Sequence, residues 1–119
     1  MPEKKARELM ENVVICGAAR TPIGGFQGAF DAVPAARLGG AAIEAALQQT
    51  SLSLVDEVVM GNVLGAGQGQ APARQASFHA GLGAQVLATT LNKMCGSGMK
   101  ATMIGFALLS PAYDRRRRS

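Results

Sequence analysis

The sequence has few aromatic residues and few cysteines, and it has no long hydrophobic run. Tryptophan is absent, aromatic residues make up 4% of the 119 residues, and there are 2 cysteines. Two isolated cysteines form neither a disulfide framework nor a zinc site, because both need paired spacings. The longest apolar stretches, such as residues 101–109, are far shorter than the roughly 20 residues that cross a bilayer. We therefore predict no bound metal and no membrane partner.

Apolar residues and glycine are what the sequence has in quantity. Hydrophobic residues make up 48% of the chain and charged residues 17%, a balance typical of a packed globular domain. There are also 15 glycines. With so few aromatic side chains, we expect a core of small and aliphatic residues in which backbone packs close to backbone.

The charged residues are concentrated towards the two ends of the sequence. The net charge is +4, and Arg115–Arg118 carry most of it, so the body of the chain is close to neutral. This distribution does not favour a nucleic-acid partner. Residues 1–12 mix both signs and lead into only a short apolar run, unlike a secretory signal peptide. Together with the lack of a disulfide framework, this predicts a cytoplasmic protein.

Short apolar runs alternate with helical patterns along the chain. The predicted strands are Val13–Gly17, Glu57–Gly61 and Val86–Leu91. The predicted helices run from Pro34 to about Gln49, from Pro72 to near Gly81, and from Gly96 to Leu109. This alternation predicts an α/β fold of βαβαβα order with a mostly parallel sheet. The last helix is apolar around its circumference, so we expect it to be buried on most sides.

Cys95 is the residue with the clearest chemical potential. It lies in the segment Asn92–Ala101, where a predicted strand is followed by a predicted helix. The first turn of a helix presents unpaired N–H groups and about half a positive charge, which favours a thiolate. Gly96 and Gly98 leave room for a carbonyl substrate to approach the sulfur and the backbone amides together. The pattern also fits a small cysteine buried at a tight turn, and the residues alone leave both alternatives open.

Several stretches resemble one known family. Asn92–Ala101 closely resembles the nucleophile segment of thiolases, the acetyl-CoA acetyltransferases. Ala19–Gly24, Gly61–Leu64 and Gly67–Gln75 agree with the same family in the same order. The resemblance covers roughly residues 13–109 and implies the N-terminal part of a thiolase-like fold.

The resemblance also implies a chemistry. In thiolases the cysteine matched by Cys95 attacks an acyl-CoA thioester, CoA departs, and an acyl-enzyme remains. The backbone N–H of the same cysteine contributes to an oxyanion hole. A second cysteine then removes an α-proton from acetyl-CoA, and the carbanion attacks the acyl group. The resemblance therefore implies acyl-CoA and CoA as substrates, no tightly bound cofactor, and homo-oligomers.

The sequence departs from the family in two places. Ala71 stands where the family usually has asparagine, which we expect to be a minor change in a loop. After Leu109 the resemblance stops, and the activating histidine and second cysteine of the family have no counterpart. We therefore predict a charged extension at 1–12, a partial thiolase N-terminal domain at 13–109 and an unrelated basic tail at 110–119. Such a truncated chain should not complete the reaction alone, whether the break is genuine or comes from a frameshift.

Neither of the remaining candidate groups is expected to replace the missing ones. His79 is predicted to end a short helix at the surface, and Cys16 to be buried in the first strand. Glycines 65, 67 and 69 lack the spacing of a dinucleotide-binding loop.

Two alternatives to an enzyme acting alone stay open. One is a non-catalytic fragment that associates with full-length thiolase subunits, and the other is a split enzyme whose second half is a separate chain. An unpaired sheet edge and an uncovered last helix also predict poor solubility. Acyl-chain length and the direction of the reaction are not determined by these residues.

Overall fold

The computed structural model describes residues 3–5 and 13–110, so most of the charged extension and nearly all of the basic tail lie outside the described residues. The elements in chain order are α2 (Ala35–Gln48), β1 (Glu57–Gly61), α3 (Pro72–His79), β2 (Leu87–Leu91) and α4 (Ser97–Leu109). These three helices and two strands confirm the predicted elements to within about two residues at each end, which is the usual scatter of element boundaries.

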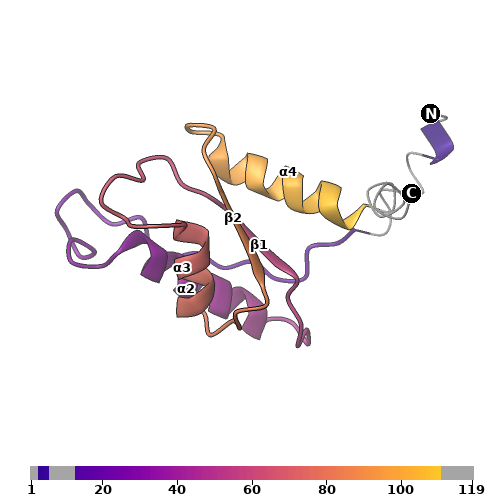
Figure 1. Ribbon diagram of the computed structural model, residues 1–119, viewed down its shortest axis with the longest axis horizontal. Coiled ribbons are helices and arrows are strands. Elements are labelled where there is room, and N and C mark those ends of the chain that lie inside the picture. Colours follow the sequence, from indigo (N-terminus) through magenta and orange to yellow (C-terminus); the bar gives the residue numbers. More distant parts are fainter. Residues whose placement is uncertain (1–2, 6–12, 111–119) are drawn as a thin grey trace.

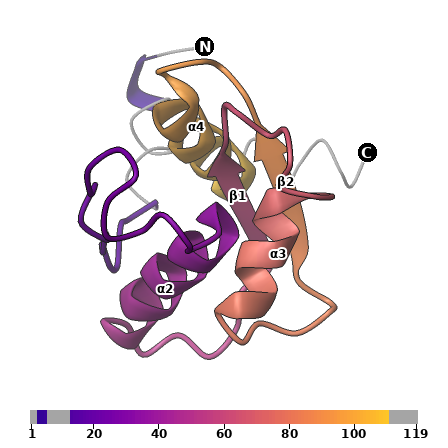
Figure 2. The ribbon, with the colours of Figure 1, turned by 90° about the vertical axis from the view of Figure 1, so that its left-hand side faces the viewer.

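The two strands form a parallel pair with helices on both faces. Glu57 lies opposite Leu87 and Gly61 opposite Leu91, and α3 makes the connection from β1 to β2. Figures 1 and 2 show α4 on one face of the pair and α3 on the other, with α2 packed against α3. The α/β class with a parallel sheet is therefore confirmed.

The core is built from small residues. The buried hydrophobic side chains of the described part are all alanine or valine: Ala36, Val58, Ala73, Ala76, Val86 and Ala101. The helices α2 and α3 approach at Gly40, where an added Cβ would lie 2.5 Å from the Cβ of His79. Backbone therefore packs close to backbone, as the glycine-rich and aromatic-poor composition predicts.

The predicted first strand, Val13–Gly17, does not form. Val14 and Ile15 are 71% and 83% exposed, and Cys16 is exposed as well, so its predicted burial is also wrong. The side-chain amide of Gln49 donates to the carbonyl of Ala18 at 2.8 Å and accepts from its N–H at 3.1 Å. These bonds hold the segment beside the end of α2. An apolar run indicates strand propensity, but a strand needs a partner strand for its hydrogen bonds.

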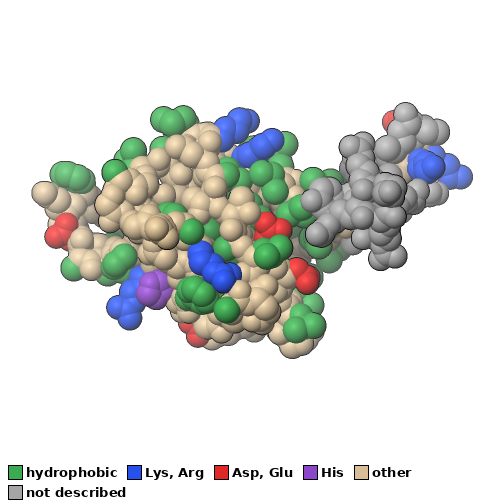
Figure 3. All heavy atoms as spheres, viewed as in Figure 1, with side chains coloured by type: hydrophobic (Ala, Val, Ile, Leu, Met, Phe, Trp, Pro, Cys, Tyr) green, Lys and Arg blue, Asp and Glu red, His purple; other side chains and the backbone are tan. Residues whose placement is uncertain are grey.

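The predicted burial of the last helix is also wrong for the described residues. In α4 only Ser97 and Ala101 are buried, whereas Met99 is 74% exposed, Met103 55% and Leu109 67%. One side of α4 packs on β1, and no described residue covers the opposite side. Figure 3 shows hydrophobic side chains at the surface over this helix. Among the described helices, none combines the length and apolar character needed to cross a membrane.

Ala71 occupies a demanding position and not an ordinary loop position. It is the residue that precedes α3, and its backbone lies in the left-handed region, with φ 46° and ψ 69°. Few residues other than glycine, asparagine and aspartate adopt this region readily, because Cβ crowds the following carbonyl. Ala71 thus lies at a helix cap with left-handed backbone and not in an ordinary loop, and we expect alanine to be a less favourable residue here than asparagine.

Candidate active site

Cys95 lies in a tight turn that joins the end of β2 to the start of α4. Residues 92–97 form this turn, and Gly96 is the residue that caps α4. Cys95 thus precedes the cap by one residue, and its side chain is exposed. The structure places the predicted nucleophile at a strand-to-helix junction, and it removes the alternative of a buried cysteine.

The backbone of the 92–97 turn is closed by two hydrogen bonds. The Gly96 N–H donates to the Lys93 carbonyl at 3.0 Å, and the Ser97 N–H donates to the Met94 carbonyl at 3.1 Å. Met94, which precedes Cys95, has a φ of 47°. A non-glycine residue in the left-handed region is strained, and such strain persists only where surrounding contacts hold it.

Two polar side chains supply those contacts. The Ser97 hydroxyl accepts from the Lys93 N–H at 2.8 Å and donates to the Met94 carbonyl at 2.6 Å. The Asn92 side chain accepts from the Met94 N–H at 2.9 Å and donates to the Val63 carbonyl at 3.2 Å. The turn is therefore braced both internally and against the loop that follows β1.

The end of β1 supports the start of α4 directly. A Cβ added at Gly61 would lie 2.6 Å from the Cβ of Ser97, so only glycine fits here without displacing the helix. The Asn62 N–H donates to the Leu91 carbonyl at 2.9 Å, which extends the strand pairing by one bond. The two stretches 61–64 and 92–101, which carry the thiolase resemblance separately in the sequence, thus form one structural unit.

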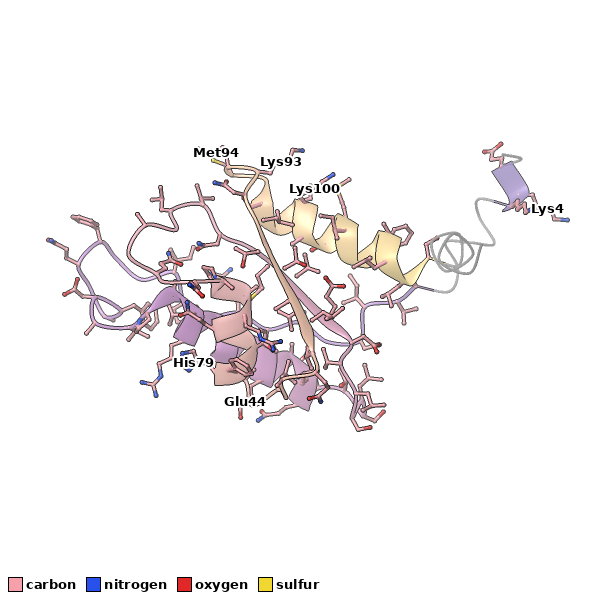
Figure 4. The ribbon with its side chains drawn as sticks, viewed as in Figure 1. Lys4, Glu44, His79, Lys93, Met94 and Lys100 are labelled. Atoms are coloured by element: carbon pink, nitrogen blue, oxygen red, sulfur yellow. The ribbon has the colours of Figure 1, made fainter. Side chains whose placement is uncertain are left out.

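The surroundings of the turn are positively charged. Lys93 and Lys100 lie at the same end of α4 as Met94, as Figure 4 shows. The first turn of α4 contains no acidic residue, and the helix N-terminus adds partial positive charge. Cationic side chains and the positive end of the helix are thus gathered at the end of α4 that follows Cys95.

The comparison with protein families agrees with this geometry. The family described as "Thiolase, N-terminal domain" matches residues 13–110, which is most of the chain. The chain belongs to the thiolase family. Its predicted resemblance is therefore confirmed, including the segment that contains Cys95.

Relatives of this thiolase chain carry acetyl-CoA acetyltransferase names. Acetyl-CoA acetyltransferase A, mitochondrial, of Xenopus laevis is 52% identical over 101 residues, covering 83% of this chain and 24% of the relative. Acetyl-CoA acetyltransferase 2 of Arabidopsis thaliana is 56% identical over 95 residues, covering 78% and 24%. Acetyl-CoA acetyltransferase of Pseudomonas aeruginosa is 54% identical over 98 residues, covering 81% and 25%. The chain spans about a quarter of the length of the curated relatives that it matches.

The other two candidate groups of this thiolase chain are not gathered around Cys95 into a catalytic cluster. His79 is the exposed last residue of α3, and Figure 4 shows it at the opposite end of the strands from Lys93 and Met94. Cys16 is exposed in the segment held beside the end of α2. In the described part of the chain, no three His, Cys, Asp or Glu side chains come together.

A small cavity lies between α2, the end of β1 and α3, and Cys95 is not among its lining residues. It measures about 100 Å³ and is lined by Ala35, Ala36, Met60, Gly61, Asn62, Gln68, Pro72, Ala73 and Ala76. Pockets for drug-sized ligands are typically about 300–1,000 Å³, so this cavity is too small for a CoA thioester.

Sequence reasoning missed the residues that hold the turn. Asn92, Ser97 and Gly61 were included in family motifs, but none was assigned a role. Their positions inside those motifs were the available signal. Their contacts join groups from β1, β2 and α4, and such contacts appear only when the elements are placed in space.

Proposed function

We propose that Cys95 is the acyl-accepting nucleophile of a thiolase-type transfer. Its thiolate sulfur attacks the carbonyl carbon of an acyl-CoA thioester and forms a new carbon–sulfur bond. The bond from that carbon to the CoA sulfur breaks, and CoA leaves as a thiolate that takes up a proton. The products are a thioester on Cys95 and free CoA. The observation that carries the proposal is the exposure of Cys95 in a braced turn that leads into α4.

The backbone of the turn supports a role in binding the developing oxyanion. Within the described turn, the N–H groups of Gly96 and Ser97 donate to backbone carbonyls, whereas the N–H of Cys95 donates to none. A preformed donor directed at the reacting carbonyl stabilises the charge that builds up in the transition state. We assign that donor role to the Cys95 N–H, with acyl-CoA as substrate and no tightly bound cofactor.

Acetylation by acetyl-CoA tests this proposal directly. The chain is incubated with acetyl-CoA, quenched in acid and digested, and the peptide that contains residue 95 is examined by mass spectrometry. We expect one added acetyl group, which Cys95→Ser removes because an alcohol is a far weaker nucleophile than a thiolate. Cys16→Ser is the matched control and should be acetylated like the original chain. Acetylation that persists in Cys95→Ser would contradict the assignment.

We propose that the carbon–carbon bond-forming step needs a second catalytic cysteine and an activating histidine. The described residues place neither group beside Cys95. His79 lies at the other end of the strands, so no described histidine can act as a base at the acyl group. We therefore expect the acyl-enzyme to form without production of acetoacetyl-CoA. Continuous assays measure the synthesis of acetoacetyl-CoA and its thiolysis by CoA. We expect both rates to equal those measured without the protein. The cytoplasmic location also stays a prediction, as do the domain boundaries at residues 13 and 109.

A second candidate function is association with a longer thiolase subunit without catalysis. The observation that favours it is the exposed apolar side of α4, where Met99, Met103 and Leu109 have no described partner. Large exposed apolar patches commonly mark protein contacts. Mixing the chain with a purified full-length acetyl-CoA acetyltransferase and separating by size would reveal a stable complex. A chain that always elutes separately argues against this function.

A further inference from the structure

The Ser97 hydroxyl is positioned to control the orientation of one peptide group. Ser97 is 5% exposed, and its hydroxyl donates to the Met94 carbonyl at 2.6 Å. Its own N–H donates to the same carbonyl at 3.1 Å. Ser97 therefore supplies two donors to one carbonyl oxygen, and these fix the direction in which that carbonyl points.

The orientation of this carbonyl determines the orientation of the Cys95 N–H. The Met94 carbonyl and the Cys95 N–H belong to the same peptide unit, which is planar and trans. In such a unit the C=O and N–H bonds point in opposite directions. Holding the Met94 carbonyl towards Ser97 therefore directs the Cys95 N–H away from Ser97, where it donates to no backbone carbonyl.

Met94 gives the turn a tendency to relax away from this arrangement. Its φ of 47° is unfavourable for a residue with a Cβ. The Ser97 hydroxyl also accepts from the Lys93 N–H at 2.8 Å, so it holds the peptide groups on both sides of the strained region. Removal of the hydroxyl leaves the strain of Met94 with less to oppose it.

We propose that Ser97 is a positioning residue that directs the Cys95 N–H towards the acyl carbonyl by holding Met94 in its left-handed conformation. The proposal rests on the proposed function of Cys95 as acyl acceptor. Ser97 touches no substrate in this role. Ser97 acts by orienting the 94–95 peptide group. This role differs from a general contribution to folding, because its loss should change that peptide group and leave the rest of the fold intact.

The test uses the full chain carrying Cys16→Ser, so that Cys95 is the remaining thiol. The variants are Ser97→Ala, Met94→Gly, their combination, and Thr102→Ala. Thr102 is the matched control because its hydroxyl, like that of Ser97, donates to a backbone carbonyl. The acceptor is the Gly98 carbonyl at 3.1 Å, which lies in α4 and outside the 92–97 turn. Two rates are measured for Cys95: acetylation by acetyl-CoA, which develops an oxyanion, and alkylation by iodoacetamide, which does not.

Ser97→Ala should slow acetylation about 10- to 100-fold, as expected for a misdirected oxyanion donor. Alkylation and the circular dichroism spectrum should stay as in the parent chain. Glycine adopts positive φ without strain, so Met94→Gly should restore much of the lost acetylation rate in the Ser97→Ala background. Thr102→Ala should behave as the parent chain does in both reactions.

Three results would overturn the proposal: unchanged acetylation in Ser97→Ala, equal slowing of acetylation and alkylation, or no restoration by Met94→Gly. If the parent chain is not acetylated at all, the proposed function fails, and hydrogen exchange then decides the positioning role. Ser97→Ala should speed amide exchange in a peptide covering residues 93–97, and Met94→Gly should reverse this. Exchange that does not respond to either substitution contradicts the positioning role independently of acetyl-CoA.

Discussion

At the scale of single residues, the left-handed backbone positions are where the sequence and the fold disagree most. Ala71 and Met94 both have positive φ although neither is glycine or asparagine. At Met94 the surrounding hydrogen bonds of Asn92 and Ser97 hold the strained conformation. At Ala71 the side chain offers no capping oxygen, and the position is held instead by its carbonyl, which accepts from the N–H groups of Arg74 at 2.8 Å and Gln75 at 3.1 Å.

Ala71→Asn should therefore stabilise the fold. Asparagine tolerates the left-handed region better than alanine, and it is favoured in front of a helix. We expect the free energy of unfolding to rise by about 0.5–1 kcal/mol. Urea denaturation followed by circular dichroism measures it. Ala80→Asn is the matched control at the other end of α3, where φ is −79° and no gain is expected. Equal effects of the two substitutions would show that backbone strain at Ala71 is unimportant.

At the scale of elements, α3 is capped by a side chain from the neighbouring strand. Ala71 offers no capping oxygen, but the Thr90 hydroxyl of β2 accepts from the Ala73 N–H at 2.9 Å. One of the unpaired N–H groups at the start of a helix is thus satisfied from outside the helix. This bond also links the crossover helix to the sheet that it connects.

Thr90→Val should weaken this link while keeping the shape of the side chain. Loss of a helix-capping oxygen typically costs about 0.5–2 kcal/mol, and we expect a decrease in unfolding free energy within that range. Thr89→Val is the control on the adjacent position, since the hydroxyl of the exposed Thr89 donates to the carboxylate of the half-buried Glu57 at 3.0 Å in a solvent-exposed bond. Exposed bonds of that kind contribute little, so the control should change stability by less than about 0.5 kcal/mol. The reverse order of effects would refute the capping role of Thr90.

The elements also show what sequence patterns can and cannot predict. Pro72 at the start of α3 and Gly61 at the end of β1 are local signals, and the elements that they delimit were predicted correctly. The strand predicted at Val13–Gly17 does not form, because the hydrogen bonds of a strand depend on a partner strand elsewhere in the chain. Cys95 could be located from its motif, whereas the bracing role of Ser97 depends on distances across the turn.

At the scale of the whole molecule, a small core is combined with a large exposed apolar helix face. The buried hydrophobic residues of the described part are alanines and valines, while larger apolar side chains of α4 remain in solvent. Burial of apolar area is the main favourable term in folding, so such a core supplies limited stability. The same apolar area is available for contacts between molecules.

We expect the isolated chain to self-associate through α4, and charge placed on its exposed face to reverse this. Met99 and Met103 are one helical turn apart on the same face, 74% and 55% exposed. The double substitution Met99→Lys and Met103→Lys should shift the chain towards monomer in size-exclusion chromatography with light scattering over a range of concentrations. Gln48→Lys with Ser53→Lys adds the same charge at exposed polar positions and controls for net charge. If both pairs reduce association equally, overall charge is responsible. If the methionine pair has no effect, the contact lies elsewhere on the molecule.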